Sequence, residues 1–192
     1  MRNTVSLSLA AALLTVSSAQ AAPASKPEAV LKTKAYMAAL NILDRNHDRM
    51  VEEIVKLTEI PAPPFKEAAR AAAYRDMLTD AGLEDVEIDE EGNAMGVYRG
   101  TGPVGGPAVM IAAHLDTVFP EGTPVKVRRE GTRLHAPGIG DGTRGLAVLL
   151  AYARPMKESG TRVKQDIIFV GNVGEEGPGD LRGVRYLLTK GK

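Results

Sequence analysis

Three short groups of histidine and carboxylate residues stand out in this chain. They are His114 with Asp116, Asp141 within a glycine-rich run, and the adjacent pair Glu175 and Glu176. Imidazole nitrogens and carboxylate oxygens, with no thiolate, suit zinc, and cobalt and manganese are alternatives. A carboxylate can also act as a general base. The three groups together predict a metal centre with a base beside it.

The first group follows an apolar run over residues 108–113, which predicts a strand. Side chains two residues apart in an extended chain point to the same side. His114 could therefore bind a metal while Asp116 accepts a hydrogen bond from the other ring nitrogen, which fixes the tautomer and makes the imidazole a better ligand. Taken alone, this pair is a weak signal and favours a structural role.

The second group is Asp141 between Gly138, Gly140 and Gly142. Glycines allow backbone angles that bring a carboxylate close to a cation. The two carboxylate oxygens could bridge two ions about 3.5–4 Å apart. A nucleotide-binding loop is the rival interpretation, but its third glycine is misplaced and no Gly-Lys-Ser/Thr follows. A plain turn is the other alternative.

The third group, Glu175 and Glu176, follows an apolar run that ends at Val173. Adjacent side chains in an extended chain point to opposite sides. One carboxylate would then bind metal while the other faces the bound water as a general base. The alternative is a solvated acidic turn.

The elements that position these groups alternate between strands and helices. This order indicates an α/β fold: a three-layer domain with a mostly parallel sheet flanked by helices. The two apolar runs predict strands that are covered on both faces. Functional sites in such sheets lie beyond the carboxyl ends of the strands, so the three groups would converge there. The expected strands are 86–88, 94–98, 108–113 and 167–173, with a hairpin in 125–134 and helices at 66–81, 146–156 and 181–189.

Residues 27–58 show a helical pattern, with apolar residues three, four or seven apart, and prolines from residue 61 onward end it. His47 lies on the apolar stripe, where a packing role is expected rather than metal binding. Pro155 should disturb the last turn of the helix over 146–156.

Composition limits the possible functions. The chain has 192 residues, 44% of them hydrophobic, and no cysteine, so it can bury one sizeable core but forms no disulfide. The formal net charge is zero, which gives no basic field for nucleic acid. No segment approaches the length of a membrane span.

The first residues predict export. Arg2, an apolar run over residues 5–16 and Ala19-Gln20-Ala21 are typical of a secretory signal peptide, with cleavage after Ala21. A buried N-terminal helix is the alternative. We therefore expect a signal peptide at 1–21, a helical segment at 22–60 and the first part of a catalytic domain at 61–192. The mature protein would be periplasmic or secreted.

Taken together, the motifs resemble those of the co-catalytic two-zinc exopeptidases. This family includes the tripeptide aminopeptidases, the glutamate carboxypeptidases and N-acyl amino acid hydrolases. Residues 113–120 match its first motif, 137–141 its second and 174–177 its third, in the same order. The spacing agrees too, with 27 residues from His114 to Asp141 and 34 from there to Glu175.

The resemblance implies a role for each residue. His114 would bind one zinc ion, Asp141 would bridge two, and Glu176 would bind the second. Asp116 would support the site from behind. Glu175 would be the base that removes a proton from the attacking water and returns it to the leaving amine.

The sequence departs from the family pattern in two places. A basic residue often follows the bridging aspartate by two places, but Arg144 follows Asp141 by three. The resemblance also implies a later acidic ligand, a late histidine and a smaller dimerisation domain between them, which would allow a homodimer. Lys192 is only 16 residues past Glu176, so these are expected beyond it. We do not expect the 192 residues to be active alone.

The function that these observations favour is a metal-dependent exopeptidase acting on small peptides. An N-acyl amino acid deacylase of the same fold is the nearest alternative, because it also splits an amide bond with two metals. A non-catalytic exported module that binds metal or peptide is the third. Such a module would not need a base beside its ligand, so Glu175 favours an enzyme.

Overall fold

The computed structural model describes residues 27–190, so the predicted signal peptide lies outside the described residues. Its centre is a four-stranded sheet with the strand order β1-β2-β6-β3. The β1–β2 and β2–β6 pairs are antiparallel, and the β3–β6 pair is parallel. The α/β prediction is confirmed, with a mixed sheet in this part of the chain. The strands are β1 (Glu84–Ile88), β2 (Ala94–Tyr98), β3 (Ala108–His114) and β6 (Asp166–Asn172).

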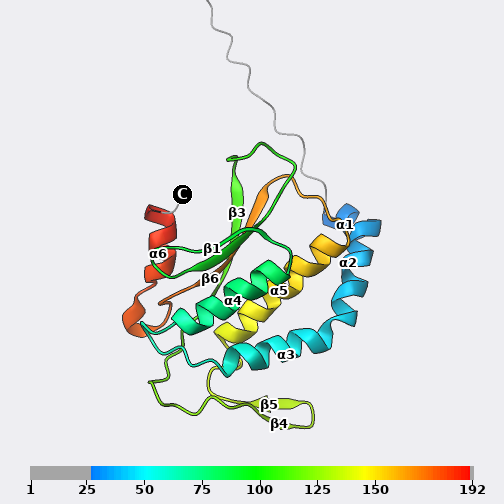
Figure 1. The fold of residues 1–192 in the computed structure, drawn as a ribbon. Helices are drawn as coiled ribbons and strands as arrows, with labels where there is room; N and C mark the ends of the chain where they lie inside the picture. Colours follow the sequence, from blue (N-terminus) through cyan, green and yellow to red (C-terminus); the bar gives the residue numbers. More distant parts are fainter. Residues whose placement is uncertain (1–26, 191–192) are drawn as a thin grey trace, which may run out of the picture.

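Helices α4 (Ala68–Asp80) and α5 (Gly142–Glu158) pack against the sheet, and Figure 1 shows them running across one of its faces. Their apolar side chains meet those of β6 in a closed core. Burying one such side chain contributes about 1.5–3 kcal/mol. The fully buried side chains include Tyr74, Leu78, Leu146, Leu150 and Phe169.

The helical stretch predicted over 27–58 is divided into α1 (Pro27–Val30), α2 (Lys34–Arg45) and α3 (His47–Thr58). Asn46 ends α2 and precedes α3, with a non-helical ψ of 10°. Asparagine favours helix ends because its side chain competes for backbone hydrogen bonds. The break turns the two helices to different directions in Figure 1, and both pack against α5.

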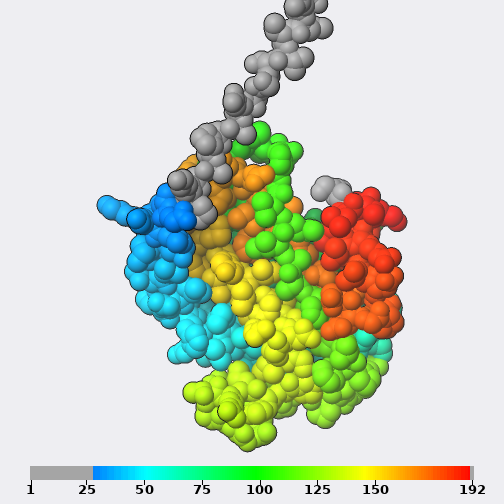
Figure 2. Space-filling view, turned by 180° about the vertical axis from the view of Figure 1, so that it is seen from behind, coloured from blue at the N-terminus to red at the C-terminus, as the bar shows by residue number. Residues whose placement is uncertain are grey.

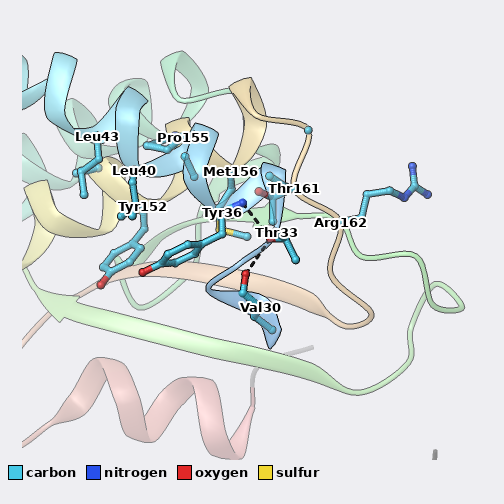
Figure 3. Close-up of a pocket in the computed structure, with 14 residues that line it drawn as sticks. Val30, Thr33, Tyr36, Leu40, Leu43, Tyr152, Pro155, Met156, Thr161 and Arg162 are labelled. Atoms are coloured by element: carbon cyan, nitrogen blue, oxygen red, sulfur yellow. Dashed lines mark hydrogen bonds between the residues drawn. The ribbon is translucent and has the colours of Figure 1, made fainter. Parts of the chain in front are cut away.

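The apolar stripe of this segment is consequently only partly buried. Leu57 of α3 lies in the core, whereas Leu40 and Leu43 of α2 line a groove of about 570 Å³ beside α5. Figure 3 shows Tyr36 and Tyr152 lying side by side along this groove. His47 lines a neighbouring hollow and is exposed.

Strand β3 differs from its prediction. It was expected to be covered on both faces, but it lies at an edge of the described sheet, with Val109 44% and Met110 37% exposed. Figure 2 shows this strand at the surface. Only Ile111 and Ala113 pack against the core. An apolar run predicts burial, but it does not reveal which strands lie beside it.

Helix α5 continues through Pro155 to Glu158, so the expected disturbance of its last turn is absent. A proline there removes only one N–H from the helical ladder. The preceding Arg154 is anchored by two hydrogen bonds to Glu53 of α3, at 2.6 and 2.9 Å, with both side chains buried. This bidentate pair fixes α3 against α5.

The remaining elements are the predicted hairpin, formed by β4 (Arg128–Glu130) and β5 (Arg133–His135), a short 3-10 turn at Gly177–Gly179, and α6 (Arg182–Thr189). No helix between residues 27 and 190 combines the length and apolar character that a membrane span requires.

Candidate metal centre

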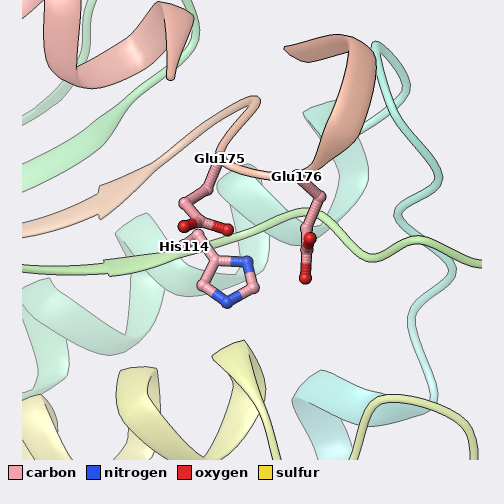
Figure 4. A group of neighbouring side chains, drawn as sticks. All are labelled: His114, Glu175 and Glu176. Carbon is pink, nitrogen blue, oxygen red and sulfur yellow. The ribbon is translucent and has the colours of Figure 1, made fainter. Parts of the chain in front are cut away.

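The side chains of His114, Glu175 and Glu176 meet beyond the ends of two neighbouring parallel strands. His114 ends β3 and pairs with Asn172, the last residue of β6, so the glutamates that follow β6 lie beside it. One ligand atom of each of the three side chains lies within 4.8 Å of the others. Figure 4 shows the carboxylates of Glu175 and Glu176 next to the imidazole ring of His114. The parallel pairing thus brings together two of the three groups found in the sequence.

The second group reaches the same place. Asp141 immediately precedes α5, and its Oδ1 lies 3.2 Å from Nε2 of His114. Its side chain is 62% exposed and makes no hydrogen bond to its own helix, so the carboxylate faces His114. Gly138, with a φ of 76°, takes the left-handed conformation in the turn that presents it.

Gly142 allows α5 to begin directly against β3. A Cβ atom at this position would lie 2.5 Å from the main-chain oxygen of His114 and 2.9 Å from its Cε1. No side chain fits at these distances, so the glycine is required for the approach of Asp141 to His114. At Gly140, two residues earlier, a Cβ atom would meet nothing within 4 Å.

We therefore expect Gly142→Ala to lower the free energy of unfolding by about 1–3 kcal/mol, the usual range for overpacking. This is opposite to the gain that alanine normally brings to a helix. Gly140→Ala is the matched control and should leave stability nearly unchanged. Denaturant titration of both variants, with metal titration beside it, measures the difference. Equal stability of the two variants would contradict the close approach.

Asp116 connects the first group to the third. It is fully buried, and its two carboxylate oxygens accept the backbone N–H groups of Glu175 at 3.0 Å and Glu176 at 2.8 Å. Nδ1 of His114 lies 3.1 Å from the main-chain oxygen of Asp116 and 3.6 Å from its carboxylate. The support of His114 thus comes chiefly from the backbone, and the carboxylate holds the glutamate pair.

The two glutamates do not diverge as expected for an extended chain. Successive N–H groups of a strand point in opposite directions, yet both N–H groups here reach one carboxylate. Gly174, with a φ of 61°, turns the chain just before them. Both side chains therefore reach His114, although Glu175 is exposed and Glu176 is half-buried.

The electrostatics of the site favour a cation. The Asp116 carboxylate is the main cause that raises the pKa of His114 to about 9, while burial opposes this and Asp141 adds to it. Burial disfavours ionised Asp116, but the nearby His114 ring and the hydrogen bonds from the two glutamate N–H groups outweigh it and lower its pKa. Burial, followed by repulsion from Glu175, raises the pKa of Glu176. Negative charge thus surrounds one imidazole.

The donor set fits a divalent ion. Zinc lies about 2.0–2.2 Å from nitrogen and oxygen ligands, so two ligands of one ion are at most about 4.4 Å apart. The atoms of His114, Glu175 and Glu176 lie within 4.8 Å of one another, so a small inward movement suffices. Nitrogen and carboxylate donors suit zinc, cobalt and manganese.

Sequence reasoning missed two buried residues that hold this region. Arg70 of α4 donates to the main-chain oxygens of Leu115, at 2.6 Å, and of Ile60, at 2.6 and 3.0 Å. Asn93 accepts the N–H of Val173 at 3.0 Å and so fixes the end of β6. These three partners lie 10, 45 and 80 positions away in sequence, so no local pattern pairs them with Arg70 or Asn93.

Comparison with known proteins agrees with this geometry. Residues 110–192 match the model of peptidase family M20/M25/M40. These residues form an M20 peptidase family domain. The predicted family resemblance is thereby confirmed, and a domain of the M20 family supports a hydrolase.

Three relatives show how far the similarity extends. The LysW-lysine hydrolase of Deinococcus radiodurans is 34% identical over 139 residues, 72% of this chain and 36% of that protein. The aminopeptidase PepT of Bacillus cereus has a TM-score of 0.58 and 26% identity over 69% of this chain and 38% of that one. A dinuclear metal-binding M20 peptidase of Bacillus subtilis, with a TM-score of 0.55 and 19% identity over 76% of this chain and 39% of that one, shares the fold. The chain thus spans less than two fifths of the length of each of these three proteins.

Proposed function

We propose that this M20 protein is a metal-dependent exopeptidase that cleaves the terminal amide bond of small peptides. The observation that carries the proposal is the meeting of His114, Glu175 and Glu176 beyond the ends of β3 and β6, with Asp141 at 3.2 Å from His114. A fold-related protein named as an aminopeptidase supports the peptide substrate.

The positions of the residues suggest a role for each of them. Two divalent ions, when bound, would acidify a water molecule and polarise the amide carbonyl. His114, Asp141 and Glu176 would hold them, and the bridging position suits Asp141 because its exposed carboxylate makes no hydrogen bond to its own helix. Glu175, the more exposed glutamate, would take the proton from the attacking water and pass it to the leaving amine. We further propose that the protein is exported, in view of its N-terminal sequence.

A second candidate has a specific observation in its favour. The relative with 34% identity is named as a hydrolase of LysW-lysine, so an acylated amino acid is also a reasonable substrate. This reaction would use the same residues. The two candidates differ only in what lies on the acyl side of the bond.

The full-length protein tests the proposal. We expect it to hydrolyse peptides with a free amino or carboxyl terminus faster than N-acyl amino acids, and to lose this activity when a chelator removes its metals. Asp141→Asn should lower both activity and the number of bound ions, because a neutral amide attracts both cations less. Asp80→Asn, an exposed aspartate at the end of α4, is the control that should change neither.

Three different results would contradict different parts of the proposal. Faster hydrolysis of N-acyl amino acids would favour the second candidate. Two ions bound at unchanged affinity in Asp141→Asn would reject the bridging role, and an absence of any metal-dependent hydrolysis would reject the function.

A further inference from the structure

Arg182, at the start of α6, joins three segments that are distant in sequence. Its Nη1 donates to the carboxylate of Glu91 at 2.7 Å and to the main-chain oxygen of the same residue at 3.0 Å. Its Nη2 donates to the carboxylate of Glu67 at 2.9 Å, and its guanidinium lies 5.4 Å from the ring centre of Phe65. One side chain thus ties the beginning of α6 to the β1–β2 turn and to the segment before α4.

The same residue packs against the turn that leads to the glutamate pair. Its backbone N–H donates to the main-chain oxygen of Gly174 at 3.2 Å. A Cβ atom at Gly174 would lie 2.5 Å from Cγ of Arg182, so the arginine stem fills the space that a side chain would occupy. Gly174 is the left-handed residue immediately before Glu175.

The backbone before Arg182 takes an unusual conformation. Asp180 and Leu181 are both left-handed, with φ values of 48° and 57°. Such conformations in residues other than glycine persist only where surrounding contacts hold them, and they gather at functional sites. The contacts of the Arg182 side chain are in a position to hold this turn.

We propose that Arg182 is a positioning residue for Glu175 and Glu176. By fixing Gly174, it keeps the two following N–H groups on the carboxylate of Asp116 and so aims both glutamates at His114. The inference rests on the proposed function, because it gives these glutamates their roles. An arginine is needed because its planar fork serves two carboxylates at once, which a lysine ammonium on a flexible stem does poorly.

The paired carboxylates show why the position is sensitive. Glu67 is 3% exposed and also accepts the N–H of Phe65 at 3.2 Å. Removal of the guanidinium would leave its charge buried without a cation, which is strongly unfavourable. Glu67 would then move or bind water, and the turn attached to Arg182 would lose its anchor.

The test compares Arg182→Met and Arg182→Lys in the full-length protein. The readout is hydrogen exchange at the amides of Glu175 and Glu176 in metal-free protein, so it does not depend on activity. We expect exchange there to become at least about tenfold faster in Arg182→Met, because the variant loses charged hydrogen bonds that oppose local opening of this turn. Arg182→Lys should give a smaller change. Arg185→Met is the matched control, because Arg185 lies on the same helix, is exposed and, among residues 27–190, forms its one side-chain ion pair with the exposed Asp180.

Steady-state kinetics of the same variants give a second readout. For Arg182→Met, kcat should fall about 10–100-fold with KM nearly unchanged, because substrate contacts are not removed, and Arg182→Lys should recover part of the loss. Unchanged exchange at residues 175 and 176 would overturn the inference, and so would an equal rise across the core amides of β6. If exchange rises locally but the wild-type protein hydrolyses no amide, Arg182 still positions the turn and only the proposed function fails.

Discussion

Glu175→Gln is expected to lower kcat by roughly 10²–10⁴-fold, the usual contribution of a general base, while the bound metals remain in place. The amide keeps the size of the side chain but cannot accept a proton at neutral pH. Glu175 is the exposed member of the pair, so its carboxylate can reach the substrate side of the site. Its backbone N–H still donates to Asp116 in the variant, and the fold should be unaffected.

Glu176→Gln is the matched comparison, because it makes the same change one residue further along. Glu176 is half-buried, and burial, followed by repulsion from Glu175, raises its pKa, so its charged form is disfavoured unless a cation lies beside it. Its replacement should weaken one metal, and added zinc should restore part of the rate. Metal analysis beside turnover measures both variants. If Glu175→Gln loses a metal, or Glu176→Gln keeps both and is merely slow, the two roles are exchanged.

This comparison is necessary because the structure brings both carboxylates to His114. Strand alternation predicts that the two side chains point to opposite sides, but the left-handed Gly174 ends this alternation just before them. A glycine in the left-handed conformation cannot be recognised from its residue type alone, since glycine populates both halves of φ space. The proposed roles therefore depend on the family resemblance and on the difference in exposure.

Other features were predictable because they are local. The strand at Ala94–Tyr98 has its predicted bounds, since turn residues precede it and a glycine-rich loop follows it. The meeting of His114 with the glutamates could be anticipated because each follows an apolar strand, and parallel neighbours end at the same edge. The burial of the last residues of β6 could also be anticipated, because they belong to an apolar run.

Long-range features could not be predicted in this way. The contacts of Arg182 span 91 positions to Glu91 and 115 to Glu67, and nothing in the sequence pairs them. The edge position of β3 depends on strand order, whereas an apolar run reports only burial. The bonds from Glu175 and Glu176 to Asp116 cross 59 and 60 positions. Such contacts become visible only once β3 and β6 are known to be neighbours.

Asp116→Asn is expected to disturb the site through those two bonds. The asparagine keeps one acceptor oxygen but turns an NH₂ donor toward the second backbone N–H. One part-buried N–H is then unpaired and the other loses a charged acceptor, which together should lower the free energy of unfolding by up to about 3 kcal/mol. The variant loses a bond that holds the glutamate pair and the negative charge beside His114. These losses should also weaken metal binding about 10–100-fold. Denaturant titration of the metal-free protein and metal titration of the folded protein measure the two effects separately.

Asp166→Asn provides the control, because it makes the same chemical change at the opposite end of β6. The Asp166 carboxylate accepts the N–H of Gly100 at 2.7 Å and pairs with Arg99 at 2.6 Å, so its replacement also removes charged acceptors from a backbone N–H and a side chain. It should cost stability without changing metal affinity, since His114 and the glutamates lie at the other end of the strand. Equal loss of metal in both variants would mean that general destabilisation explains the effect, and Asp116 would then be a structural residue only. A loss confined to Asp116→Asn would show that this buried carboxylate holds the site together.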